Sequence, residues 1–244
     1  MEGKEYLLLT ILILLNSSAI AQNNQSIYQA YVAGNMGQWK SSMDSIDAIE
    51  RKTSREVLDL INYQYGYIGW CVGIKKNDEA KKLLRKAADA LEQLEEKRYN
   101  ESMIYAYKAA FVGFEILMAP HKAPFIGPKS LGYAKKSITL DASNALAYVQ
   151  LGNIAYYTPK LFGGSKDEAI KHYLKALKIM GTSSEYSSPN WNYLNLLIAL
   201  INAYMDTNLY EAAKKYCLKT LALEPGFDWV KNNLYPQVLK NLKE

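Results

Sequence analysis

The chain has 244 residues, of which 49% are hydrophobic and 22% are charged, and its formal net charge is +5. This composition supplies ample apolar material for a folded core. The basic residues are spread out with no long block, so the sequence gives no reason to expect a nucleic-acid partner. The charge predicts a solvated helical surface, with weak attraction to an anionic membrane or cell-wall polymer as the alternative.

Residues 1–21 are typical of a secretory signal peptide. Lys4 precedes a mostly apolar run over Tyr6–Leu15, and Ala19-Ile20-Ala21 forms a small-residue cleavage site. The run covers about half of the roughly 20 residues that a spanning helix needs. We therefore expect an exported, periplasmic protein with no membrane span after cleavage. Retention as an uncleaved anchor is the alternative, because acidic residues flank Lys4.

From residue 22 onward, apolar residues recur every three or four positions, which predicts an all-α fold without strands. The predicted helices are Ser26–Gly34, Gly37–Arg51, Ser54–Lys75, Asp78–Lys97, Glu101–Met118, Pro128–Leu140, Asn144–Tyr157, Lys166–Met180, Pro189–Thr207, Leu209–Leu223 and Asp228–Leu242. Short turns join most of these helices, which suggests a stack of antiparallel pairs with internal repetition.

Helix start signals support these boundaries. Thr53 with Glu56, and Ser165 with Glu168, have the spacing of a capping box, in which a hydroxyl and a carboxylate satisfy exposed amides. Ser188-Pro189 places a cap before a proline at the first helical position.

Three predicted helices share a small residue, a larger residue four positions later, and a second small or compact residue three positions further on. These residues are Ala80, Leu84 and Ala87; Ala169, Tyr173 and Ala176; and Ala213, Cys217 and Thr220. Small residues let two helices approach closely, and the larger residue fills the gap between pairs.

This pattern resembles the tetratricopeptide repeat (TPR), a 34-residue pair of antiparallel helices. In the best-matching unit, Ala145–Leu177, the first helix carries Tyr148, Leu151 and Gly152 at signature positions, and Pro225 closes the next unit. Successive units are 50, 39 and 44 residues apart, so we expect an irregular array. The resemblance implies that residues 22–244 form an α-solenoid, a TPR-like right-handed superhelix of about eleven helices.

The stretch TPKLFGG, residues 158–164, lies between the two helices of the best-matching unit. Glycines before a helix can cradle a phosphate on helix-start amides. Here the phosphate-loop pattern after a strand is missing, and Asp167 and Glu168 would repel an anion. We therefore predict an elbow between paired helices, similar to an elbow in exported bacterial repeat proteins that include the T component associated with TRAP transporters.

Side chains suited to catalysis are few. His121 and His172 are the two histidines, and no HExxH, EF-hand or GxSxG motif occurs. We expect no enzymatic activity, no cofactor and no metal. We place His172 at the surface or groove edge, and His121 in an irregular link over His121–Lys129. Cys71 and Cys217 lie in apolar helical patterns and are predicted to be buried free thiols, with a disulfide as the alternative.

The resemblance also implies a concave groove, lined by positions 2, 5, 9, 12 and 13 of the first helix in each pair. In the two best units these are Leu146, Val149, Asn153, Tyr156 and Tyr157, and Asn195, Ile198, Asn202, Met205 and Asp206. The candidate binding residues are Val149, Asn153, Tyr156, Tyr157, Ile198, Asn202 and Met205.

Asparagine recurs at position 9, as Asn153 and Asn202, and its amide offers a donor and an acceptor to a peptide backbone. Polar lining or local capping is the alternative role for this pair. Some related grooves clamp a terminal carboxylate with lysines at position 5. Val149 and Ile198 occupy that position here, so we expect no such clamp.

The resemblance implies a non-enzymatic scaffold in the cell envelope that binds a protein or peptide through its concave face. The alternative is a small-ligand-binding accessory protein of a transport system, similar to the TRAP T component. A closed pocket near Tyr157 and Phe162 would favour the small ligand, whereas a broad open groove would favour the peptide.

Overall fold

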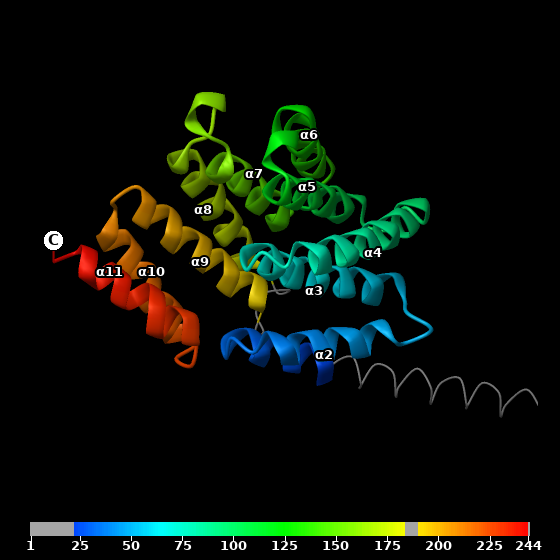
Figure 1. The fold of residues 1–244 in the computed structure, drawn as a ribbon, viewed down its shortest axis with the longest axis horizontal. Helices are drawn as coiled ribbons and strands as arrows, with labels where there is room; N and C mark the ends of the chain where they lie inside the picture. Colours follow the sequence, from blue (N-terminus) through cyan, green and yellow to red (C-terminus); the bar gives the residue numbers. More distant parts are fainter. Residues whose placement is uncertain (1–21, 184–189, 244) are drawn as a thin grey trace, which may run out of the picture.

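The computed structural model of the chain describes residues 22–183 and 190–243, and the predicted signal peptide over residues 1–21 lies outside this part. The described residues are mainly helical and contain no β-strand, which confirms the predicted fold class. After helical residues 22–32 the order is α2 (Met36–Asp47), α3 (Ser54–Gly73), α4 (Asn77–Glu96), α5 (Glu101–Met118), η1 (Pro120–Lys122), α6 (Ala123–Leu140), α7 (Ala145–Tyr157), η2 (Lys160–Phe162), α8 (Lys166–Thr182), α9 (Trp191–Asp206), α10 (Tyr210–Leu223), η4 (Val230–Leu234) and α11 (Tyr235–Asn241) (Figure 1).

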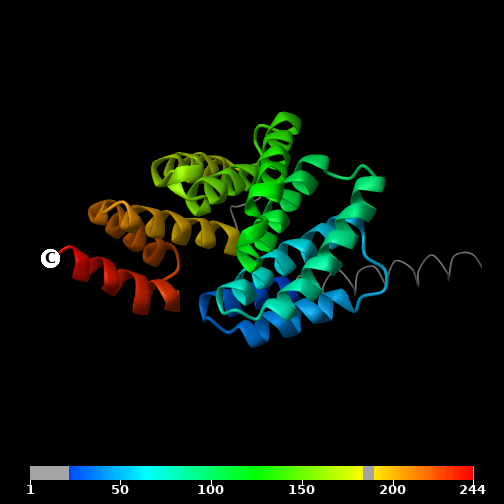
Figure 2. The same cartoon turned by 45° about the horizontal axis from the view of Figure 1, so that its top comes forward.

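Consecutive helices form antiparallel pairs that stack into a curved array (Figures 1 and 2). We call the first helix of each pair helix A and the second helix B. Helices A are residues 22–32, α3, α5, α7 and α9, and helices B are α2, α4, α6, α8 and α10. The curvature brings the first helix A back against α9 and against the turn that follows α10.

The repeat signature residues make a close contact within the fourth pair. Gly152 of α7 faces the ring of Tyr173 of α8, and a Cβ atom added at Gly152 would lie 2.3 Å from that ring. Ala169 and Ala176, which flank Tyr173 on α8, are fully buried. Small residues therefore bring the two helices together around one large ring, as the sequence pattern predicts.

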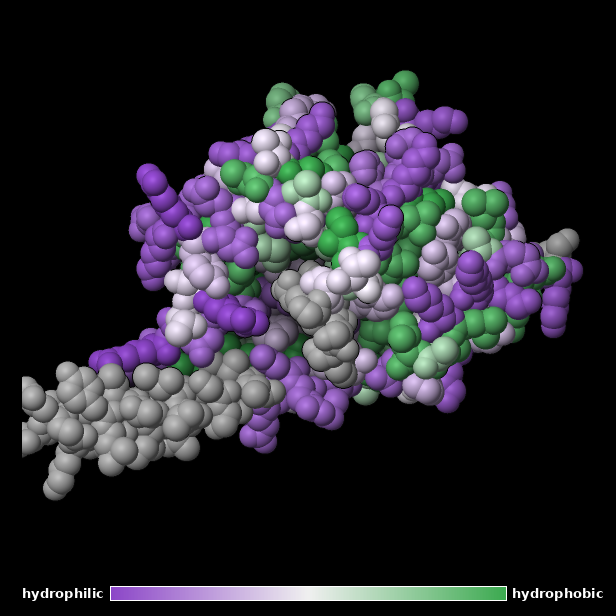
Figure 3. Space-filling view, turned by 180° about the vertical axis from the view of Figure 1, so that it is seen from behind, coloured by the Kyte–Doolittle hydropathy of each residue, from purple (hydrophilic) through white to green (hydrophobic). Residues whose placement is uncertain are grey.

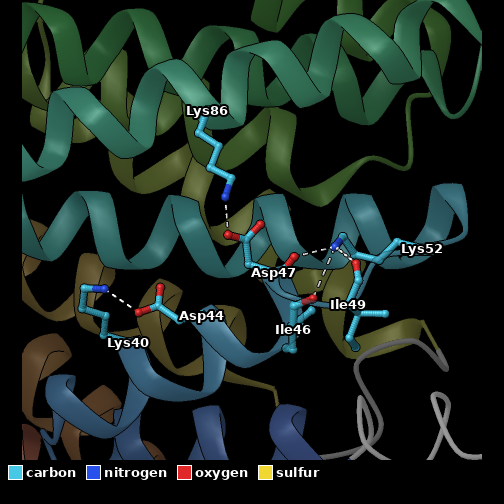
Figure 4. A network of polar contacts seen from close by, with 7 residues as sticks. All are labelled: Lys40, Asp44, Ile46, Asp47, Ile49, Lys52 and Lys86. Carbon is cyan, nitrogen blue, oxygen red and sulfur yellow. Dashed lines mark hydrogen bonds and ion pairs between the residues drawn. The ribbon is translucent and has the colours of Figure 1, made fainter.

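Helix α2 ends at Asp47, earlier than the predicted range Gly37–Arg51. The ammonium of Lys52 donates hydrogen bonds to the backbone carbonyl oxygens of Ile46, Asp47 and Ile49 (Figure 4). The last carbonyls of a helix have no intrahelical partner, so a lysine that reaches back to them stabilises the early end.

The prediction of an irregular link over His121–Lys129 was wrong. A short 3-10 helix covers Pro120–Lys122, and α6 begins directly at Ala123. Pro124 lies in the first turn of α6, where a missing N–H costs no intrahelical bond. Pro128 lies further inside and removes one bond, which the packed helix tolerates.

The two predicted capping boxes differ. Thr53 and Glu56 form the complete box, with each side chain bonded to the other residue's backbone N–H. Ser165 caps α8 by accepting a hydrogen bond from the backbone N–H of Glu168. The Glu168 carboxylate pairs with Lys171, at 2.6 Å, so the second box is only half formed.

The last part of the chain differs from the predicted helices at the start of α9 and in the form of the final helix. The start signal Ser188-Pro189 lies outside the described residues, and Asn190 caps α9 through its side chain. The final helical segment begins at Asp228, as predicted, and contains a π-helical turn over Val230–Leu234. Pro236 follows this turn and has no N–H to donate, which disfavours a regular α-helical ladder there.

Candidate functional site

A cavity of about 1000 Å³ lies between the first helix, the N-terminal parts of α3, α5, α7 and α9, and the C-terminal end of α8. Its polar wall includes Asn24, Arg55, Asp59, Asn62, Asn100, Asp141, Asn144, Asn153, Asn190, Asn192, Asn195 and Glu224. Its aromatic wall is formed by Tyr28, Tyr63, Tyr65, Tyr107 and Trp191. The volume is at the upper end of the range of about 300–1000 Å³ that is usual for ligand pockets.

The structure places the predicted groove residues in two groups. Val149 and Asn153 of α7 line the cavity, together with the position-2 residues Leu146 and Asn195. The other candidates, Tyr156, Tyr157, Ile198, Asn202 and Met205, are not in its wall. The cavity stops halfway along α7 and α9, so the later groove positions of both helices lie beyond it.

Asn153 is held in place by a chain of hydrogen bonds across three helices. Its Oδ1 accepts from the hydroxyl of Tyr173 at 2.8 Å, and its Nδ2 donates to Oε1 of Gln150 at 3.3 Å. Gln150 in turn donates from Nε2 to the hydroxyl of Tyr65, at 3.3 Å. A further hydrogen bond links Asn153 with the hydroxyl of Tyr65, so the amide is held in a fixed orientation at the cavity wall.

Three helix N-termini reach the cavity. Asn100, Asn144 and Asn190 are the N-caps of α5, α7 and α9, and all three line its wall. The N-terminal end of an α-helix carries a partial positive charge. This field favours an occupant that presents carbonyl oxygens, whereas Asp59, Asp141 and Glu224 in the same wall disfavour a carboxylate.

The first helix closes one side of the cavity. The hydroxyl of Tyr31 donates to Oδ1 of Asn195 on α9 at 3.1 Å. The Tyr31 ring meets Trp39 and Trp191 edge to face, with both centroid distances 5.7 Å, and Phe227 at 5.3 Å. We call Tyr31, Trp39, Trp191, Asn195 and Phe227 the aromatic clasp. These five residues join the start of the array to α9 and to the turn after α10.

The aromatic clasp packs so closely against α3 that it leaves no room for a side chain at Gly66. A Cβ atom added at Gly66 of α3 would lie 2.7 Å from Trp191 and 2.8 Å from Trp39. Tyr28 adds a further link by donating from its hydroxyl to Oε2 of Glu224, at 2.9 Å. These contacts turn the concave face from a through-running groove into a partly enclosed cavity.

Polar atoms near the cavity are not all satisfied within the chain. The indole N–H of Trp191 is buried and has no hydrogen-bond partner, and Oδ1 of Asn24 is likewise unpaired. Both residues belong to the cavity wall. A buried polar group without a partner is costly, about 1–3 kcal/mol.

Sequence reasoning missed much of this wall. Asn62 of α3, Tyr65 of α3 and Asn24 of the first helix all line the cavity, and none was among the candidates. Recurrent asparagines on the other helices A were a usable signal. The approach of the first helix to Trp191 was not, because it depends on the curvature of the whole array.

Tyr156 ties three helices together outside the cavity. Its hydroxyl donates to Oδ2 of Asp206 at 2.6 Å, and Lys166 pairs with the same oxygen at 3.3 Å. The Lys166 ammonium also lies 3.2 Å from the centroid of the Tyr156 ring. Burial, and then the hydrogen bond to Asp206, raise the pKa of Tyr156 above its usual value. This cluster joins α7, α8 and α9.

The stretch TPKLFGG is the predicted elbow between α7 and α8. Gly163 has a φ of +88°, and a Cβ atom added at Gly164 would lie 1.7 Å from the carbonyl oxygen of Thr158. The Gly164 N–H donates to the carbonyl oxygen of Pro159, and the Ser165 N–H to that of Ala155. These two amides hold the turn closed and are not free to cradle a phosphate.

The two cysteines, Cys71 and Cys217, are buried free thiols, as predicted. Burial raises the pKa of each thiol to about 11. Within residues 22–183 and 190–243, no group of three or more metal-ligating side chains gathers. In the same part of the chain, none of the helices combines the length and the apolar character needed to cross a bilayer.

Comparison with known proteins identifies the fold. No protein-family model and no curated protein matches the chain. The HusA haemophore from Porphyromonas gingivalis has a similar structure, with a TM-score of 0.59 and 19% identity over 80% of this chain and 94% of that one. A thermophilic TPR protein from Thermus thermophilus gives a TM-score of 0.57 and 14% identity, over 94% of this chain and all of that one.

The chain is therefore an all-α, TPR-like helical solenoid, as the repeat residues predicted. At these identities the likeness concerns the fold alone.

Proposed function

We propose that this protein is a non-enzymatic binding protein of the cell envelope that holds a segment of another polypeptide in its cavity. The observation that carries the proposal is the placement of Asn62, Asn153 and Asn195, from three different helices A, around one cavity. An asparagine amide both donates and accepts, as a peptide group does. Asparagines spaced along the array suit an extended backbone better than a compact apolar molecule.

The electrostatics of the cavity support the same occupant. The N-terminal ends of α5, α7 and α9 favour carbonyl oxygens at the cavity wall. A peptide backbone supplies carbonyl oxygens at regular intervals. The envelope location rests on the sequence of residues 1–21, which predicts export to the periplasm.

A small-molecule binder is the second candidate. The aromatic clasp partly encloses the cavity, and Tyr63, Tyr65 and Tyr107 give it flat apolar surface. One structural neighbour is described as a haemophore, so haem is a suitable first probe for this candidate. A transport-accessory role, the sequence-based alternative, would require such a ligand.

Site-specific photocrosslinking tests the proposal. A benzophenone amino acid replaces Ala199, which lines the cavity, in the full chain, and the protein is irradiated with peptides from digested envelope proteins. The same amino acid at Leu218, exposed on α10, is the background control. Peptides captured at position 199 and absent at position 218 would support the peptide-binding role.

Matched variants locate the contacts. Asn153→Ala with Asn195→Ala should lower the affinity of a captured peptide about tenfold or more, because two amides are removed. Asn202→Ala, outside the cavity wall, should leave the affinity unchanged. Because Asn195 also bonds Tyr31, the variant Tyr31→Phe separates loss of closure from loss of contact.

The readouts separate the two candidates. If no peptide is captured and haem or a co-purified small molecule binds in native mass spectrometry, the small-molecule role replaces the peptide role. If peptides bind equally well to the double variant, the cavity is not their site and the proposal is wrong.

A further inference from the structure

Apolar side chains are concentrated on two turns of the surface. Leu161, Phe125 and Phe162 are 87%, 83% and 72% exposed, and they are the three most exposed large hydrophobic residues in the described part of the chain. Tyr157, the next most exposed at 60%, ends the helix that leads into η2. Exposed apolar side chains that gather in a patch often mark an interaction surface.

The two turns occupy equivalent places in the fold. Phe125 lies in the first turn of α6, directly after η1, and Leu161 and Phe162 lie in η2 between α7 and α8. Both are elbows from helix A to helix B, in consecutive pairs, so they lie at the same end of the stack. Figure 1 shows both elbows projecting at the top of the molecule, and Figure 3 shows hydrophobic residues at the tips of the same projections from behind.

Basic residues outnumber acidic ones in the two elbow segments themselves, and the exposed Asp167 and Glu168 lie beyond η2, in the first turn of α8. Between Glu115 and Asp141, and again between Asp141 and Asp167, the chain contains no acidic residue. Lys122 and Lys129 flank Phe125, and Lys160 precedes Leu161, and all three lysines are exposed. Projecting apolar tips with basic neighbours match a bilayer, whose anionic headgroups attract lysine and whose interface accepts apolar side chains.

We propose that the elbows at η1 and η2 dock the protein on the surface of a membrane that contains anionic lipid. Phe125, Leu161 and Phe162 insert at the level of the headgroups, while Lys122, Lys129 and Lys160 contact the lipid phosphates. The contact is peripheral and reversible, and it is independent of any occupant of the cavity.

Vesicle co-sedimentation tests the docking. The full chain is mixed with vesicles of phosphatidylglycerol and phosphatidylcholine, or of phosphatidylcholine alone. The triple variant Phe125→Ser, Leu161→Ser, Phe162→Ser should bind the anionic vesicles at least about tenfold more weakly. The control Ile74→Ser, Leu209→Ser, Leu223→Ser removes exposed apolar residues elsewhere and should bind as the wild type does.

Residues 1–21 are the same in all variants, so any binding by the N-terminal apolar run cancels in the comparison. Replacing Lys122, Lys129 and Lys160 with glutamine should abolish the preference for phosphatidylglycerol, at about fivefold per lysine near the surface. Equal binding by the two serine variants, or equal binding to both vesicle types by the wild type, would overturn the proposal.

A fluorescent reporter places the elbow in the bilayer directly. The native thiols Cys71 and Cys217 are buried, so a dye attached at Phe162→Cys reports on that position alone. Its emission should shift to the blue on phosphatidylglycerol vesicles, whereas dye at Leu223→Cys should not respond. If the triple serine variant instead converts a dimer into a monomer in sedimentation velocity, with vesicle binding unchanged, the elbows form a protein interface and the lipid proposal fails.

Discussion

The hydroxyl of Tyr31 donates a hydrogen bond to Oδ1 of Asn195, although 164 residues separate them in the chain. This bond joins the first helix of the array to α9, the fifth helix A. A TPR-like stack holds most of its contacts between neighbouring pairs. Here the first helix A contacts the fifth, so the shape of the cavity depends on all five helix pairs.

Removal of this bond should weaken the closure measurably. Tyr31→Phe keeps the ring contacts with Trp39 and Trp191 but loses the hydroxyl, so the free energy of unfolding should fall by about 1 kcal/mol. Equilibrium denaturation in urea measures this change. Tyr210→Phe, which removes an exposed bond to Asn208 within a turn, is the matched control and should have a smaller effect. Equal losses in both variants would contradict a special role for Tyr31.

Two glycines of α3 should respond to alanine in opposite directions. A Cβ atom at Gly66 would overlap Trp191 and Trp39, so Gly66→Ala should destabilise the fold by about 1–3 kcal/mol. At Gly69 the new Cβ would lie 3.5 Å from Phe114, an ordinary contact. Gly69→Ala should therefore stabilise the fold by up to about 1 kcal/mol through helix propensity. Thermal unfolding of the two variants gives the signs, and a stable Gly66→Ala protein would rule out the packing described for the aromatic clasp.

Local sequence signals were sufficient for the helices and for one wall of the cavity. Apolar periodicity and the small residues Ala169 and Ala176 predicted the paired helices, because these signals act within one pair. The repeat positions brought Val149 and Asn153 to the cavity wall for the same reason. The end of α2 was misplaced, since Lys52 caps it from outside the helix.

The extent of the cavity depends on contacts that no local pattern contains. Ile198, Asn202 and Met205 follow the same repeat rule as Asn195, yet they do not line the cavity. Its limits are set where the first helix meets α9 through Tyr31. That meeting depends on the sum of small rotations over five pairs, which the sequence of any single pair does not specify.

Tyr156 should matter for stability and not for binding. Tyr156→Phe removes a 2.6 Å hydrogen bond to the partly exposed carboxylate of Asp206 and should lower the free energy of unfolding by about 1 kcal/mol. Tyr156 does not line the cavity, so the affinity for a cavity ligand should stay the same. Urea denaturation and a binding titration on the same sample separate the two effects. A drop in affinity comparable to that of Asn153→Ala would restore Tyr156 as a binding residue.

His172 should make the fold less stable in mild acid. Burial lowers the pKa of its imidazole in the folded chain, with a smaller opposing effect from the Glu168 carboxylate. The unfolded chain therefore binds the proton more tightly, and the free energy of unfolding should fall as the pH drops below about 6.5. His172→Gln has no proton to gain, so its unfolding midpoint should change less than that of the wild type between about pH 7.5 and pH 5.5. Identical shifts for both proteins would mean that the imidazole is as easily protonated in the fold as in the unfolded chain.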